Sequence, residues 1–67
     1  MFRERVVLED GVMLELAFGS PADYRLRCSK GGRILVEYTA ASRYEFKSVE
    51  KLRYDFERDV EDALRQD

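Results

Sequence analysis

The sequence predicts an α+β fold: an antiparallel sheet of four or five strands with one C-terminal helix packed on one face, in the order ββββ(β)α. Three observations predict it. Between residues 2 and 38, apolar and polar side chains alternate in four short segments, which is typical of strands with one buried face. Turn-forming residues separate these segments. From residue 48 onward, apolar residues recur at steps of three and four, as on an amphipathic helix.

Length and composition restrict the class of protein. A chain of 67 residues makes one domain, 1–67, near the lower size limit for a core without disulfides or metals. The single cysteine, Cys28, excludes an intramolecular disulfide, which fits a reducing compartment. No apolar run approaches the ~18 residues of a membrane span, and the N-terminus leads into a strand pattern instead of a signal-peptide apolar segment. We therefore expect a cytoplasmic protein without membrane contact.

Residues 2–18 are expected to form a β-hairpin around Asp10-Gly11. A three-residue loop, 9–11, with Gly11 in the left-handed conformation, places like side chains opposite each other and unlike charges together. The resulting pairs are Leu8 with Val12, Val6 with Leu14, Phe2 with Phe18, and Arg5 with Glu15. Glu4 then shares the apolar face, and we expect it at the margin of the sheet, where its carboxylate reaches water.

A second hairpin is expected after the proline-containing turn at residues 19–23. A three-residue loop around Gly31-Gly32 would pair Cys28 with Ile34, Leu26 with Val36, and Arg25 with Glu37. This register turns Ile34 toward the core and leaves its two neighbours in sequence on the opposite face. Residues 43–47 alternate again and form either a short last strand or a continuation of the fourth.

The helix is expected to begin after Ser48, whose hydroxyl can accept a hydrogen bond from the first turn, and to run roughly 17 residues, or about 25 Å. Its apolar stripe must cover the sheet. The predicted core is Val6, Leu8, Leu14, Leu16, Phe18, Tyr24, Leu26, Ile34, Val36, Phe46, Leu52, Phe56, Val60 and Leu64.

The uncovered face of the sheet is the first candidate binding surface. It is rich in arginine and carries some apolar residues; the candidates are Arg25, Arg27, Arg33, Leu35 and Met13. Guanidinium groups match phosphate oxygens, and Val7, Met13 and Leu35 form an apolar patch that favours a protein partner or a second subunit. The alternative is a solvated face with cross-strand ion pairs. The acidic pI of about 5.1 and the lack of aromatic residues on this face disfavour nucleic acid.

The outer surface of the helix is the second candidate. Tyr54 points away from the apolar stripe and lies beside Glu50, Glu57, Glu61 and Arg58, so an exposed aromatic ring in an acidic environment could anchor a basic partner. Asp55 and Asp59 are counted with the solvent-exposed acids of this surface. The alternative is a solubilising helix face with ion pairs four residues apart.

Catalysis is not expected. The chain has no histidine, which removes the commonest general base and metal ligand. Cys28 projects inward as a buried thiol without a base nearby, and Gly31-Gly32 lacks the strand–loop–helix context of a phosphate-binding loop. We expect a protein that is not an enzyme and that has no cofactor and no metal.

At the start of the helix the chain has the pattern Phe46-x-Ser48-x-Glu50-x-Leu52-x-x-x-Phe56. With the short antiparallel strands before it, this segment resembles small phage-encoded anti-CRISPR proteins of the type I-F inhibitor kind. The resemblance covers about eleven of the 67 residues, and most of its pattern is that of any capped amphipathic helix. It implies a non-enzymatic inhibitor that binds a CRISPR surveillance complex and blocks target DNA, and no site residue is carried over.

Two hypotheses of function follow. The first is a protein–protein interaction module, with a phage-type inhibitor that docks on a larger bacterial complex as its specific form. The second is a nucleic-acid-binding domain that uses the arginine-rich sheet face. A homodimer formed by sheet-to-sheet or edge pairing is compatible with either.

Overall fold

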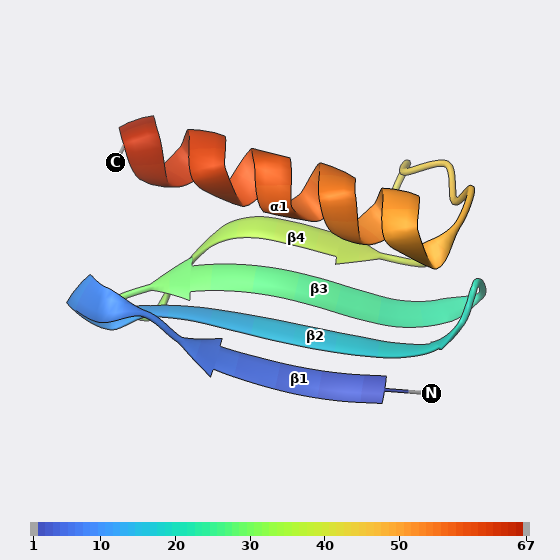
Figure 1. Ribbon diagram of the computed structural model, residues 1–67, viewed down its shortest axis with the longest axis horizontal. Helices are drawn as coiled ribbons and strands as arrows, with labels where there is room; N and C mark the ends of the chain where they lie inside the picture. Colours follow the sequence, from blue (N-terminus) through green and yellow to red (C-terminus); the bar gives the residue numbers. More distant parts are fainter. Residues whose placement is uncertain (1, 67) are drawn as a thin grey trace.

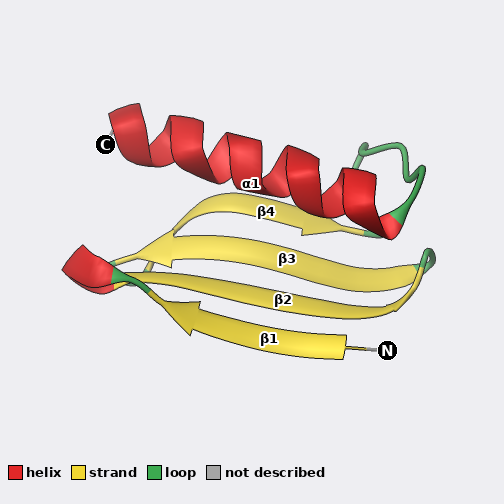
Figure 2. Ribbon diagram, in the orientation of Figure 1, coloured by secondary structure: helices red, strands yellow, loops and turns green. Residues whose placement is uncertain are grey.

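The computed structural model describes residues 2–66, in which four antiparallel strands are followed by one helix (Figure 1, Figure 2). The strands are β1 (Phe2–Val7), β2 (Val12–Ser20), β3 (Asp23–Lys30) and β4 (Arg33–Thr39), and they lie side by side in sequence order. The helix, α1 (Val49–Gln66), packs on one face of the sheet and runs antiparallel to β4 (Figure 1). The predicted α+β class is confirmed, with four strands, because residues 43–47 form none.

The register of the first hairpin is as predicted. Val6 pairs with Leu14, and Arg5 with Glu15. The short turn η1 (Glu9–Gly11) joins the two strands, with Gly11 at φ 75° and Asp10 at φ 63°. Both values lie in the left-handed region, which glycine and aspartate tolerate better than most residues. The loop therefore contains two left-handed residues, where the sequence predicted one.

The predicted register of the second hairpin is wrong. Gly31 and Gly32 both have positive φ, 58° and 83°, and they form a two-residue turn of the kind that matches strand twist. Lys30 therefore pairs with Arg33. The shift in register between Cys28 and Ser29 leaves Leu35 as an extra residue on β4, which is a β-bulge.

The bulge moves three side chains to the face opposite to the predicted one. Ile34 pairs with Ser29 on the open face and is 50% exposed, so its assignment to the core is wrong. Leu35 was predicted on the open face; it is half-buried and packs against the core. Arg33, also predicted there, lies opposite Lys30 on the helix side of the sheet's end. The physical reason is that one inserted residue reverses the alternation of a strand.

The core lies between the sheet and α1. Phe56 and Leu26 are almost fully buried, as predicted, whereas Leu8 is 42% exposed and does not belong to the core. Leu8 follows the end of the edge strand β1, and its neighbour across the hairpin, Val12, is buried instead. The buried apolar residues are Val12, Leu16, Tyr24, Leu26, Cys28, Leu52, Phe56 and Val60.

The connection between β4 and α1 packs onto the sheet without joining it. Phe46 stacks on Phe18 with a centroid distance of 5.8 Å and lies 6.0 Å from Tyr24. The Ser48 hydroxyl then accepts a hydrogen bond from the Lys51 backbone N–H at 3.1 Å, which is the predicted N-cap. The alternation of residues 43–47 therefore reflects inward-pointing aromatic rings and not an additional strand.

Glu4, the acid expected at the sheet margin, contacts the helix. Its carboxylate lies 3.1 Å from the guanidinium of Arg53. Because both side chains are more than 40% exposed, we expect this ion pair to contribute at most about 1 kcal/mol. It joins the first strand to the last element and shows that the Glu4 side chain lies on the helix side of the sheet.

Candidate functional site

The face of the sheet opposite α1 is organised in three rows that cross the four strands. The register places residues from β1 to β4 opposite one another in each row. The rows, named here for their chemistry, are the arginine row (Arg3, Ala17, Arg25, Thr39), the ion-pair row (Arg5, Glu15, Arg27, Glu37) and the apolar row (Val7, Met13, Ser29, Ile34). Of the predicted site residues, Arg25, Arg27 and Met13 lie in these rows.

The ion-pair row alternates in charge across the sheet. Glu15 accepts from Arg5 at 3.4 Å on one side and from Arg27 at 3.2 Å on the other, and Glu37 lies 4.0 Å from Arg27. Cross-strand pairs of this kind contribute roughly 0.2–1 kcal/mol each. The positive charges of Arg5 and Arg27 are therefore balanced within the sheet, so Arg27 fits the structural alternative better than a binding role.

The arginine row differs because its charges have no acidic partner. Within residues 2–66, neither Arg3 nor Arg25 makes an ion pair. They lie on either side of Ala17, so their Cα atoms are about 10 Å apart at the usual strand spacing. Two hollows, of about 500 Å³ and 460 Å³, share these three residues in their lining. A negatively charged group above Ala17 could contact both guanidinium groups.

The apolar row exposes branched side chains to solvent. Val7 is 72% exposed and Ile34 50%, with Met13 half-buried between the two outer strands. Ile34 reaches this row only because of the β4 bulge, so the predicted patch of Val7, Met13 and Leu35 contains Ile34 in place of Leu35. Val7 and Met13 are neighbours, and Ile34 lies beyond Ser29 on the other outer strand. Exposed apolar side chains on one face are typical of a binding surface.

The outer surface of α1 carries the other predicted site residues, but its charges are largely paired with one another. Tyr54 is 61% exposed, as predicted. Its ring lies 5.8 Å from Lys51 Nζ and 5.9 Å from the Arg58 guanidinium, and both cations also contact the Asp55 carboxylate. The exposed acids Glu57 and Glu61 pair with Arg53 at 3.5 Å and Arg65 at 3.2 Å; the exposed Glu50 lies in the first turn.

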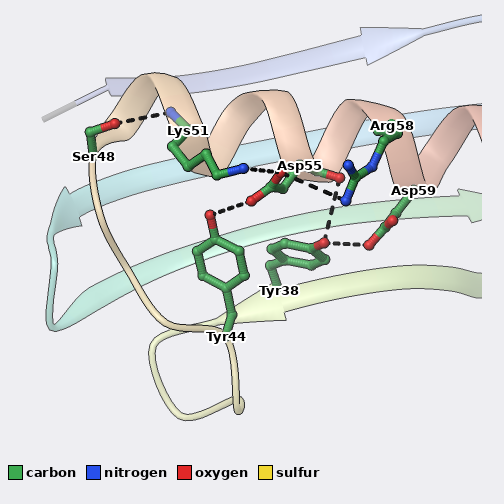
Figure 3. A network of polar contacts seen from close by, with 7 residues as sticks. All are labelled: Tyr38, Tyr44, Ser48, Lys51, Asp55, Arg58 and Asp59. Atoms are coloured by element: carbon green, nitrogen blue, oxygen red, sulfur yellow. Dashed lines mark hydrogen bonds and ion pairs between the residues drawn. The ribbon is translucent and has the colours of Figure 1, made fainter.

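A network of polar contacts joins α1 to β4 and to the connecting segment (Figure 3). The predicted exposure of Asp55 is wrong: this side chain is buried, with 7% exposed. Its carboxylate accepts from the Tyr44 hydroxyl at 2.8 Å and from Lys51 Nζ at 3.1 Å. The Tyr38 hydroxyl donates to the carboxylate of Asp59 (Figure 3).

These contacts shift the pKa values of the groups that make them. Burial, followed by the hydrogen bond to Asp55, raises the pKa of Tyr44 to about 12. Burial and the contact with Asp59 also raise the pKa of Tyr38. The hydrogen bond from Tyr44 lowers the pKa of Asp55, an effect partly offset by burial and reinforced by Lys51 and Arg58. At neutral pH the tyrosines are therefore hydrogen-bond donors and Asp55 is an ionised acceptor.

The network holds elements together and leaves no reactive group exposed. Sequence reasoning missed it, although one signal was present: two inward-pointing tyrosines need partners for their hydroxyl groups, and Asp55 directly precedes the buried Phe56. Burial raises the pKa of the Cys28 thiol, which makes this side chain less reactive. Residues 2–66 contain no group of three or more Cys, Asp or Glu side chains placed to hold a metal ion.

No helix in the described part of the chain is both long and apolar enough to cross a lipid bilayer. Comparison with protein-family models, with curated proteins and with solved structures gives no significant match.

Proposed function

We propose that this chain is a non-enzymatic interaction module that binds another protein through the open face of its sheet. The observation that supports this proposal is the combination of Arg3 and Arg25, which lack acidic partners, with an exposed apolar row on the same face. A partner that covers this face would bury Val7 and Ile34 and provide acidic groups for the arginines. The buried, unpaired Cys28 fits a partner in the cytoplasm.

The pattern of the rows favours a different protein over a second copy of the same chain. Two copies packed face to face about an axis parallel to the strands would place each row on itself in reversed strand order. Arg3 would then face Thr39 and Arg25 would face Ala17, so neither would gain an acidic partner. An axis across the strands would place the arginine row on the apolar row, which would leave charges without partners. Neither arrangement provides acidic partners for Arg3 and Arg25, so a partner with its own acidic and apolar groups fits better.

Substitutions on the two faces of the molecule test the proposal. Met13→Glu introduces a charge into the apolar row, and Tyr54→Ala removes the exposed ring of the helix without touching the sheet. We expect a partner protein that co-purifies with the unaltered chain to be lost with Met13→Glu and retained with Tyr54→Ala. The opposite pattern would place the binding surface on the helix, and retention by both variants would contradict a role for the open face.

The resemblance to small anti-CRISPR proteins gives the proposal its most specific form. In this form the chain is a phage-type inhibitor that docks on a type I-F surveillance complex and prevents it from binding target DNA. Adding the purified chain to such a complex and measuring target-DNA binding tests it. Unchanged DNA binding at saturating protein would remove this form and leave the general proposal intact.

Nucleic-acid binding is the alternative, and the arginine row is the observation that favours it. Against it, the ion-pair row already balances Arg5 and Arg27, and none of the residues in the three rows is aromatic, so bases would lack a stacking surface. Fluorescence anisotropy with single- and double-stranded DNA measures this directly. Binding that weakens steeply with salt and is lost with Arg25→Gln would favour nucleic acid over protein.

A further inference from the structure

We infer that the arginine row is a carboxylate site, which binds one Asp or Glu side chain of the partner; this inference rests on the function proposed above. Arg3 and Arg25 lie on the two strands that flank Ala17. Neither arginine makes an ion pair within residues 2–66. The side chain of Ala17 between the two arginines is a single methyl group, so the space above Ala17 is accessible. A carboxylate above Ala17 can accept charge-assisted hydrogen bonds from both guanidinium groups.

The charge of the surroundings favours one carboxylate over a phosphate. The charged side chains around this row on the open face have a net charge of +1. They are Arg3, Arg5, Arg25, Arg27, Glu15, Glu37 and Asp23. One negative charge balances this net charge of +1. A phosphate dianion would leave an excess negative charge and would lie near three carboxylates.

The position of the hollows indicates that a segment of the partner passes across the site. One hollow extends from the arginine row toward Gly19 and Thr39, and the other extends toward Arg5 and Arg27. The acidic residue therefore belongs to a continuing chain and not to a terminus. In the direction of Arg5, the apolar row follows four residues further along β1, β2 and β3, which is about 13 Å.

This distance defines the partner segment. A helix advances about 10.5–12 Å over seven or eight residues, and residues at that spacing share a face. We infer an amphipathic helix that places an acidic side chain over Ala17 and an apolar side chain, seven or eight residues away, over Met13. It would cover the open face as α1 covers the other, which gives the sheet a helix on each side.

A small ligand with one carboxylate tests the site without knowledge of the partner. The probe is N-acetyl-glutamate N-methylamide, compared with the uncharged glutamine analogue at constant ionic strength, with backbone amide and arginine side-chain NMR signals as readout. We expect saturable shifts at Arg3, Ala17 and Arg25, with a Kd of about 10 mM, for the glutamate probe alone. Arg25→Gln abolishes these shifts, while Arg43→Gln, which removes the same charge outside the sheet, preserves them.

Equal shifts with the glutamine analogue, or shifts confined to other residues, would overturn the carboxylate site. Tighter binding of inorganic phosphate than of the glutamate probe would overturn its selectivity. If the probe does not bind but a co-purified partner is lost with Met13→Glu, the carboxylate site fails and the proposed function stands. If the probe does not bind and the partner is retained with Met13→Glu, both the carboxylate site and the proposed function fail.

A substitution at Ala17 provides a second test that needs no ligand. Ala17→Glu places a carboxylate between the two arginines, and Ala17→Gln is its uncharged match. We expect the glutamate variant to have a Tm about 2–5 °C above that of the glutamine variant, with a smaller difference at high salt. An equal or lower Tm for the glutamate variant would contradict the assigned geometry.

Discussion

Asp55 is the only charged side chain that the structure buries within residues 2–66, and it depends on its hydrogen bonds to remain ionised there. The Tyr44 hydroxyl is one donor and Lys51 Nζ the other. Since Tyr44 belongs to the connecting segment and Asp55 to α1, their contact holds this segment against the helix. The stability of the domain should therefore respond to changes at these two side chains.

Replacing Tyr44 by Phe removes one donor and keeps the ring. We expect the free energy of unfolding to fall by about 1 kcal/mol, because a buried acceptor loses a partner while the ring packing against Tyr38, at 5.0 Å between centroids, remains. Urea unfolding measures the change. Tyr54→Phe is the matched control, since that hydroxyl is on an exposed side chain; an equal loss in both variants would contradict the role of the hydrogen bond.

The same contact predicts how stability depends on pH. The pKa of Tyr44 rises from 10.0 to about 12 on folding, so its contribution is complete below pH 10 and is lost as pH rises toward 12. The pKa of Asp55 is lowered from 3.8, so its contribution is present above about pH 4 and is lost in acid. We expect Asp55→Asn to reduce the loss of stability between pH 7 and pH 3, measured by urea unfolding. An unchanged acid profile would contradict the ionised state of Asp55.

Strand β4 demonstrates how one local feature decides the chemistry of a face. Its bulge turns Ile34 to solvent and Leu35 toward the core, the reverse of the register predicted from the sequence. Gly31-Gly32 is compatible with a two-residue or a three-residue loop, because each glycine tolerates positive φ. The alternation of residues 33–38 fits both loops. In the structure the two-residue loop is adopted, and Leu35 packs against the core instead of Ile34.

A pair of substitutions distinguishes the two registers. Ile34→Lys should change the free energy of unfolding by less than about 0.5 kcal/mol, since that side chain is half exposed. Leu35→Lys should cost about 2 kcal/mol, because a half-buried apolar side chain is lost and a charge is introduced near the core. Thermal or urea unfolding measures both. The reverse order would restore the register that the sequence predicted.

The helix is the element that the sequence predicts best. Its stripe is strongly periodic, Ser48 caps it, and Phe56 is fully buried. Phe56→Ala should cost about 3–5 kcal/mol, which is comparable to the total stability expected for a core of this size. We expect this variant to lose its cooperative unfolding transition in circular dichroism, while Tyr54→Ala retains it. A folded, cooperative Phe56→Ala variant would contradict the importance of this contact.

For the whole molecule, the sequence predicts the layers but only part of the binding surface. Alternation and turn residues give the four strands and the covered face, and Arg25 and Met13 were assigned correctly to the open one. The exposure of Ile34 was missed because Gly31-Gly32 fits two loop lengths and the bulge arises only from pairing with β3. The burial of Asp55 was missed because its partner Tyr44 lies in a different segment. Residue patterns within one segment cannot specify such contacts.

The open face also predicts the oligomeric state. Face-to-face packing of two copies gives Arg3 and Arg25 no acidic partner, and the edge strand β1 carries charged residues that disfavour edge pairing. We therefore expect a monomer. Sedimentation at micromolar concentration measures it. A stable dimer disrupted by Met13→Glu would show that a second copy occupies the face.

The most direct test is site-specific photo-cross-linking in the cells that produce the protein, with a photoreactive amino acid in place of Met13 or of Tyr54. The account predicts a discrete cross-linked protein from position 13 that disappears when Arg25→Gln is added and persists with Arg43→Gln. Cross-links from position 54 alone would contradict it, since the binding surface would then lie on the helix and not on the open face of the sheet.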